Sequence, residues 1–171
     1  MNIFDVHIKN GEVIDGTGAP KFKSDIVINK GKIIGIFPAE NGDVRDPSEN
    51  HFLSNFRAKH TINAENKIIS PGFIDVHTHD DDNVFLDPSM SSKISPGVTT
   101  CVAGNCGISL APFSYKGEVP APIALLGKSE VFRFPRVNDY KKEFNNKPSS
   151  VNLALLTCLL YTSDAADDDH C

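Results

Sequence analysis

The sequence lacks an excess of either charge, and this excludes one class of partner. The 171 residues carry 17 lysines and arginines against 22 aspartates and glutamates, a formal net charge of −5. Four of the 22 acidic residues and none of the basic ones lie in residues 158–171, so the rest of the chain has 17 basic against 18 acidic residues. Nucleic-acid binding needs a basic surface, so we expect no nucleic-acid partner.

Cysteines are few, and long apolar runs are absent. Cys158 and Cys171 fall in the terminal segment, and the remaining Cys101 and Cys106 are too few for the disulfide framework of a small secreted domain. The first residues do not have the basic start and apolar stretch of a secretory leader. The longest apolar run, at 151–161, is too short to span a bilayer. We therefore expect a cytoplasmic protein that has no membrane partner.

The first third of the chain has the pattern of strands and turns. Apolar residues alternate with polar ones from residue 4 to residue 8, and Asn10-Gly11 then predicts a tight hairpin. Apolar runs at 25–28 and 32–36 flank a second turn at 29–31. Residues 38–61 are polar and aperiodic, which indicates a long surface loop or insertion. We predict an antiparallel β unit over residues 1–66.

A second region begins at residue 67 and has a strand, helix, strand pattern. After the break at Pro71-Gly72, residues 73–79 have the pattern of a buried strand, and residues 87–94 that of a short helix capped by Asp87. Residues 97–103 are rich in β-branched side chains and predict a second buried strand. This order and spacing indicate a parallel βαβ unit, and therefore an α/β fold.

Two histidines share one face of the first of these strands. Side chains at alternate strand positions point the same way, so Asp75, His77 and His79 are expected on one side. Two imidazoles near the carboxyl end of a strand can bind one metal ion together. The alternative is a pair of hydrogen-bonded core histidines, but burying two imidazoles beside an aspartate without a ligand is costly. The pattern therefore favours a metal site.

Cys106 follows the second strand, in the sequence Gly104-Asn105-Cys106-Gly107. The flanking glycines permit a sharp turn that brings the thiol close to the neighbouring strand end, where a thiolate is a good zinc ligand. From the residues alone, a small buried core side chain is an equally good interpretation of Cys106. Cys101 lies within the predicted strand and is expected to fill the core.

These motifs together resemble the N-acyl-D-amino-acid deacylase (D-aminoacylase) family of the metal-dependent amidohydrolase superfamily. Residues 69–79, Ile-Ser-Pro-Gly-Phe-Ile-Asp-Val-His-Thr-His, are similar to the first barrel strand of the superfamily. The segments 10–20, 79–81, 97–100 and 104–109 are similar to the D-aminoacylase family, and the last of these is the most specific. The resemblance covers residues 3–37 and 62–110, is weak over 111–150 and returns at 151–154.

The resemblance implies a fold and a chemistry. Family members place a small β-sandwich, built from both chain ends, beside a (β/α)8 TIM barrel. Residues 1–66 are then expected to be part of the sandwich, and residues 67–157 the first part of the barrel. His77, His79 and Cys106 match zinc ligands of the family. The metal would lower the pKa of a bound water and polarise an acyl carbonyl, and an aspartate from a late barrel strand would act as general base. The implied reaction converts N-acyl-D-amino acids to a carboxylate and a free D-amino acid.

The length of the chain suggests only part of such an enzyme. A barrel needs about 250 residues, whereas about 90 follow the first strand motif. The late aspartate has no counterpart, so we expect the chain to be inactive alone and to aggregate through exposed strand edges. Residues 158–171 match the translation of a sequencing-library adapter, and we expect them to be an artefact. The donor cluster at 167–171 is discounted as a metal site for that reason.

Two other functions fit parts of the pattern. The first is an amidohydrolase acting on cyclic amides, like a dihydroorotase or hydantoinase, although the Gly-Asn-Cys-Gly sequence argues against it. The second is a non-enzymatic zinc-binding fragment. The sequence carries no signal for the oligomeric state.

Overall fold

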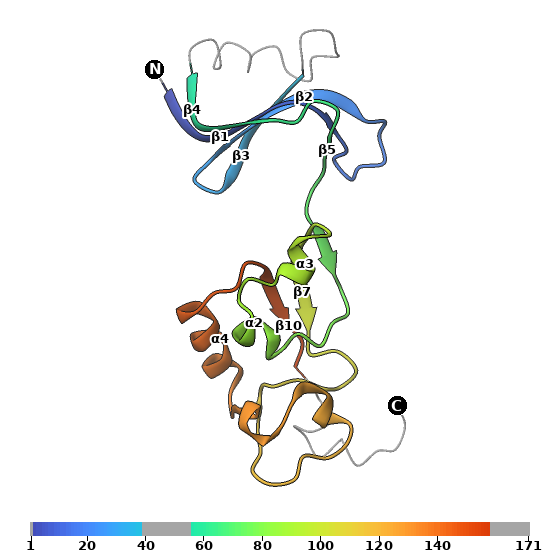
Figure 1. Cartoon of the computed structure of the whole chain (residues 1–171), viewed down its shortest axis with the longest axis vertical. Coiled ribbons are helices and arrows are strands. Elements are labelled where there is room, and N and C mark those ends of the chain that lie inside the picture. Colours follow the sequence, from blue (N-terminus) through green and yellow to red (C-terminus); the bar gives the residue numbers. More distant parts are fainter. Residues whose placement is uncertain (1, 39–55, 158–171) are drawn as a thin grey trace. The chain divides into compact units, whose positions relative to one another are not determined.

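The chain consists of two compact units, Met1–Pro71 and Gly72–Cys171 (Figure 1). The structure, a computed structural model, describes residues 2–38 and 56–157. The expected adapter-derived segment 158–171 therefore lies outside the described residues, as do residues 39–55 of the expected loop.

The first unit is a five-stranded mixed sheet. β1 pairs antiparallel with β2 and parallel with β4 and β5, and β2 pairs antiparallel with β3. Phe4, Val27 and Phe37 are buried together, with Phe56 packed against them. The strands are β1 (Asn2–Val13), β2 (Phe22–Asn29), β3 (Lys32–Pro38), β4 (Phe56–Asn63) and β5 (Ile68–Ile69).

The turn chemistry of this unit is only partly as expected. Lys30-Gly31 joins β2 to β3, and both residues have positive φ, 51° and 71°, as a two-residue hairpin turn requires. The hairpin expected at Asn10-Gly11 is wrong. β1 continues through both residues, with a register irregularity between Ile8 and Gly11. Asn10 has a φ of 64°, so its tolerance of the left-handed region produces a bulge in the strand rather than a chain reversal.

β4 corrects the expectation that all of 38–61 is a loop. Residues 56–61 form most of this strand, which pairs in parallel with β1 from Phe56 opposite Asn2 to Asn63 opposite Lys9. Most of its side chains are exposed, so apolar alternation is weak. The strand is defined by pairing with a segment far away in sequence, which local composition does not reveal.

The second unit contains a three-stranded parallel sheet in the order β10-β7-β6. This confirms the expected parallel βαβ arrangement. An excursion between β7 and α4 contains a two-stranded antiparallel ribbon and two 3-10 helices. The elements are β6 (Phe73–Asp75), α2 (Asn83–Leu86), α3 (Ser91–Ile94), β7 (Val98–Ala103), β8 (Phe113–Ser114), η1 (Ile123–Leu126), η2 (Ser129–Val131), β9 (Arg133–Phe134), α4 (Val137–Asn146) and β10 (Asn152–Leu155).

The helix expected to begin at Asp87 starts later. α3 begins at Ser91, after Met90, which has a φ of 46° and a fully buried side chain. The Asp87 carboxylate instead accepts the N–H of Ser89, so it stabilises the turn that precedes the helix. Met90 has a left-handed backbone conformation and its side chain is buried in the core. Because a left-handed residue cannot belong to a right-handed helix, the helix begins only at the next residue.

The core of the second unit lies around β7. Cys101 is fully buried in that strand, which confirms its expected place in the core. Phe85, Phe134 and Tyr140 pack edge to face or at a tilt, with ring centroids 5.0–5.8 Å apart.

Over residues 2–38 and 56–157, no helix has the length and apolar character needed to cross a bilayer.

Candidate metal centre

His77 and His79 lie just beyond the carboxyl end of β6 rather than within the strand. The expected strand 73–79 ends at Asp75, where the regular pairing of β6 with β7 also ends. Asp75 accepts the N–H of His77 at its Oδ1, at 3.2 Å, which bends the chain out of the extended conformation. The imidazole centroids are still only 5.9 Å apart, so the pair remains together as the sequence predicts.

Cys106 lies in the loop that follows β7. Gly104, Cys106 and Gly107 all have positive φ, 80°, 58° and 69°. This left-handed run turns the loop sharply and is strained at the cysteine, because a Cβ is disfavoured there. The thiol is exposed, and its Sγ lies 3.0 Å from Nε2 of His77. The alternative interpretation of Cys106 as a buried core residue is therefore wrong.

The three side chains expected to bind metal converge. One donor atom each from His77, His79 and Cys106 lies within 4.8 Å of the others. Ligands around a tetrahedral zinc ion lie about 3.3–3.8 Å apart when the metal–ligand bonds have their usual lengths. Two imidazoles and a thiolate are also donor types that zinc prefers. Small side-chain rotations would therefore let these residues hold such an ion.

A buried nitrogen without a partner supports the same interpretation. Among the described residues, the Nδ1 atom of His79 is the buried side-chain nitrogen or oxygen that has no hydrogen-bond partner. An unsatisfied polar atom in this position costs free energy unless a ligand or an outer partner completes it. The imidazole of His79 therefore has an unsatisfied nitrogen that a bound ion or an outer partner would complete.

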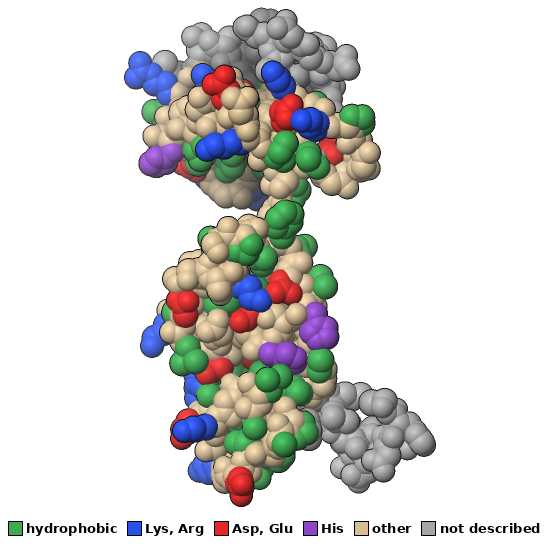
Figure 2. Space-filling view, turned by 45° about the vertical axis from the view of Figure 1, so that its right-hand side comes forward, with side chains coloured by type: hydrophobic (Ala, Val, Ile, Leu, Met, Phe, Trp, Pro, Cys, Tyr) green, Lys and Arg blue, Asp and Glu red, His purple; other side chains and the backbone are tan. Residues whose placement is uncertain are grey.

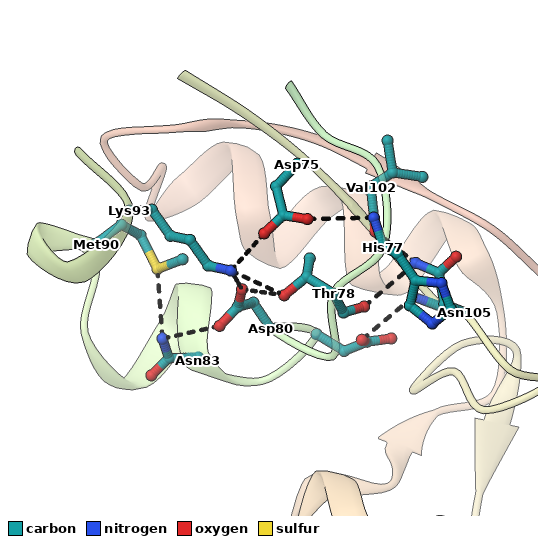
Figure 3. Close-up of polar contacts among 11 residues, drawn as sticks. Asp75, His77, Thr78, Asp80, Asn83, Met90, Lys93, Val102 and Asn105 are labelled. Carbon is teal, nitrogen blue, oxygen red and sulfur yellow. Dashed lines mark hydrogen bonds and ion pairs between the residues drawn. The ribbon is translucent and has the colours of Figure 1, made fainter. Parts of the chain in front are cut away.

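Lys93, from α3, contacts the segment that carries both histidines (Figure 3). Its Nζ lies 2.6 Å from Oδ2 of Asp75, 2.9 Å from Oδ2 of Asp80 and 3.2 Å from Oγ1 of Thr78. The hydrogen bond from Lys93 holds the pKa of Asp75 below its usual value. Burial by itself would raise the pKa of Asp80, but hydrogen bonds from Thr78 and Lys93 outweigh it and lower the value. Both carboxylates therefore remain charged.

The charge state of Lys93 follows from the same contacts. Burial disfavours the ammonium, but the hydrogen bonds to Asp75 and Asp80 outweigh this and raise the pKa of Lys93 above its ordinary value. The side chain is 22% exposed, so the cluster is partly shielded from water. Lys93 is therefore a permanent cation between two anions.

Asp81 connects the histidine segment to the cysteine loop. Its side chain is fully buried, and its carboxylate accepts the backbone N–H groups of Gly104 at 3.3 Å and Leu110 at 3.4 Å, on either side of Cys106. Burial raises the pKa of Asp81. Tyr140 donates its hydroxyl to the backbone carbonyl of Asp81 at 2.6 Å.

Asn105 makes a second connection between the two segments. Its side-chain amide donates to the carbonyl of Val102 at 2.6 Å and to that of Thr78 at 3.3 Å. Sequence patterns assign no role to Lys93, Asp81 or Asn105. For Asp81 and Asn105 the only signal was their place inside family-like motifs, and Lys93 had none.

Figure 2 shows histidine side chains at the surface of the second unit, with hydrophobic side chains beside them. Several of the exposed apolar residues belong to β6 and its extension: Phe73 is 60% exposed, Ile74 60% and Val76 68%. β6 is also an edge of its sheet in the described part of the chain. The candidate centre therefore lies beside an uncovered sheet edge.

Comparison with known families gives a match over the region that holds this centre. The sequence pattern of the amidohydrolase family matches residues 60–149. This range includes β6, β7 and the loops carrying His77, His79 and Cys106.

Individual relatives are similar over most of the chain. An N-acyl-D-aspartate deacylase of Alcaligenes xylosoxydans xylosoxydans is 37% identical over 149 residues, and a D-aminoacylase of the same organism is 38% identical over 154 residues. The aligned regions cover 87% and 90% of this chain but 27% and 28% of those proteins. The chain thus spans a little over a quarter of the length of these curated relatives.

A solved structure gives a comparable result. The N-acyl-D-glutamate deacylase of Bordetella bronchiseptica, crystallised with zinc and a phosphonate that mimics the tetrahedral intermediate, superposes with a TM-score of 0.76 at 37% identity. The superposition covers 92% of this chain and 30% of that one.

Proposed function

This chain belongs to the amidohydrolase family, and from that premise we propose that it forms part of a metal-dependent hydrolase that cleaves the amide bond of N-acyl-D-amino acids. Its fold is α/β: β6, β7 and β10 are parallel strands of a (β/α)8 barrel, and a small β unit precedes them. The observation that carries the proposal is the convergence of His77, His79 and Cys106. The products would be a carboxylate and a free D-amino acid.

The choice of substrate class is supported by the relatives. The proteins compared above are deacylases of N-acyl-D-aspartate and N-acyl-D-glutamate and a D-aminoacylase. A small-molecule N-acyl amino acid is therefore the proposed substrate, in preference to a cyclic amide. We also propose a cytoplasmic location, because Cys101 and Cys106 are free thiols in the described part of the chain.

His77, His79 and Cys106 would hold zinc, and we propose them as ligands on the fit of their donor types and spacing. When bound, the ion supplies Lewis acidity and lowers the pKa of water. Cys106, placed by the left-handed turn of its loop, would contribute a negatively charged ligand that partly neutralises the ion. His79 would gain a partner for an imidazole that now has one buried, unpaired nitrogen.

The aspartates beside the site are engaged in other interactions. Asp75 and Asp80 are paired with Lys93, and Asp81 is buried against backbone N–H groups. None of these carboxylates is free to accept a proton from a water molecule at the site. We therefore propose that the general base is an aspartate on a later barrel strand of a longer protein.

The test begins with the source DNA. Sequencing across the codon for Thr157 should give a frame that continues into further barrel strands. The protein expressed from that frame should hydrolyse N-acetyl-D-amino acids, and the Cys106→Ala variant should lose that activity. Hydrolysis of hydantoins or dihydroorotate without hydrolysis of N-acetyl-D-amino acids would contradict the proposed substrate class.

A further inference from the structure

Lys93 lies outside the proposed ligand set but contacts the chain on both sides of the histidine pair. Its ammonium forms ion pairs with Asp75 at 2.6 Å and with Asp80 at 2.9 Å. Asp75 precedes His77 by two residues, and Asp80 directly follows His79. The two ion pairs therefore flank both imidazoles in the sequence, and Figure 3 shows Lys93 reaching both Asp75 and Asp80.

The flanked segment is not part of a regular strand. β6 ends at Asp75. Beyond it, the N–H of Thr78 donates to the carbonyl of Val102 in β7, and the carbonyl of Thr78 accepts from Asn105 in the loop that follows β7. These bonds fix the middle of the segment. Its two ends are fixed by carboxylates that share one ammonium, and Thr78 adds its hydroxyl to the same cation at 3.2 Å.

We propose that Lys93 is a positioning residue for the candidate metal centre. By holding Asp75 and Asp80 on one ammonium, it sets the path of residues 75–80, and that path directs the imidazoles of His77 and His79 toward the thiol of Cys106. This inference rests on the metal site proposed above. It assigns Lys93 the outer-sphere role of orienting ligands, and loss of such a residue typically weakens metal binding about 10- to 100-fold.

A purely electrostatic role for Lys93 predicts the opposite result from a positioning role. Removing a positive charge near a cation site reduces repulsion and leaves two carboxylates to attract the ion, so binding would become tighter. Loss of positioning makes binding weaker, because the donors no longer converge. The sign of the change in metal affinity therefore separates the two roles.

The experiment is a Co2+ titration of the full 171-residue chain in dilute solution, followed by the thiolate-to-metal charge-transfer absorbance. Cys158 and Cys171 are replaced by serine in every protein, so that the signal does not come from the terminal thiols. Replacing Lys93 by methionine is expected to weaken Co2+ binding about 10- to 100-fold. Lys93→Arg keeps the charge and can reach both carboxylates, so its affinity should lie between those of the parent and Lys93→Met.

Two control variants define the result. Lys59→Met removes another paired lysine, 2.7 Å from Asp5 in the first unit, and should bind Co2+ like the parent. Cys106→Ser should abolish the charge-transfer signal. Unchanged or tighter binding by Lys93→Met would overturn the positioning role while leaving the metal site intact. If the parent gives no more signal than Cys106→Ser, the metal site itself is absent, and the proposed function falls together with this inference.

Circular dichroism without metal shows whether each variant is folded. If Lys93→Met does not fold, the double variant Lys93→Met/Asp80→Asn removes the ion pair without changing the net charge. The double variant Lys59→Met/Asp5→Asn removes a Lys–Asp pair of the first unit and is its matched control. Weaker Co2+ binding by the first double variant than by the second supports the inference, and equal affinities overturn it.

Discussion

At the scale of single residues, the cysteine loop depends on a carboxylate that lies outside the proposed ligand set. Asp81 is fully buried and receives the N–H groups of Gly104 and Leu110. Replacing one carboxylate oxygen by an amide NH2 group would set a donor against one of those N–H donors. A buried polar group left without its partner costs about 1–3 kcal/mol.

We therefore expect Asp81→Asn to lower the free energy of unfolding by about 1–3 kcal/mol and to weaken Co2+ binding through Cys106. Urea denaturation followed by circular dichroism measures the first effect. Asp82→Asn is the matched control, because its partner Arg133 is 41% exposed and the lost interaction is screened by water. Equal losses of stability in the two variants would contradict this role for Asp81.

The residues that could be predicted from the sequence are those whose type and spacing carry the chemistry. His77 and His79 were proposed because alternate strand positions share a face. The glycines beside Cys106 mark a turn after a strand, but only the family resemblance favoured it as a ligand over a core residue. Lys93 could not be found in this way. It meets Asp75 across 18 positions of the sequence, and a lysine in a short polar segment looks like any exposed lysine until the fold brings the two together.

At the scale of elements, the turn between β2 and β3 holds a lysine in an unfavourable backbone conformation. Lys30 has a φ of 51°, and its N–H donates to Asp5. Asparagine tolerates this region better and retains the N–H.

Lys30→Asn should therefore raise the stability of the first unit by roughly 0.5–1 kcal/mol. Thermal unfolding followed by the β-sheet circular dichroism signal measures this change. Lys32→Asn, two positions along and within β3, should instead lower the transition temperature, because asparagine is disfavoured in strands. A lower transition temperature for Lys30→Asn would show that the turn does not limit the stability of the unit.

Elements were predicted well where their own residues carry the pattern. β2, β3 and β7 have apolar or β-branched runs, and each was expected at or near its position. β4 was missed because its polar sequence becomes a strand only through parallel pairing with β1. The Asn10-Gly11 sequence was misassigned because a left-handed residue can form either a hairpin turn or a bulge, and long-range pairing decides between them.

At the scale of the whole molecule, β6 is an edge strand within the described ranges 2–38 and 56–157, and it carries exposed apolar side chains. Ile74 is 60% exposed and Val76 is 68% exposed. Such an edge offers unpaired backbone groups to another chain. We expect the purified chain to associate with time, as measured by light scattering.

Ile74→Lys should slow that association several-fold, because a charge on an edge strand disfavours pairing between sheets. Leu125→Lys is its control. It also replaces an exposed apolar side chain, 64% accessible, but in the 3-10 helix η1 rather than on a sheet edge. Equal slowing by both variants would show that general surface apolarity, rather than the β6 edge, causes the association.

The close spacing of the proposed ligands along the chain has a consequence for biosynthesis. His77 and Cys106 are 29 positions apart, and both precede β10. During translation, His77, His79 and Cys106 are therefore all synthesised before β10. An ion bound by these residues during synthesis would fix β6 and β7 relative to each other before the rest of the sheet assembles beside them.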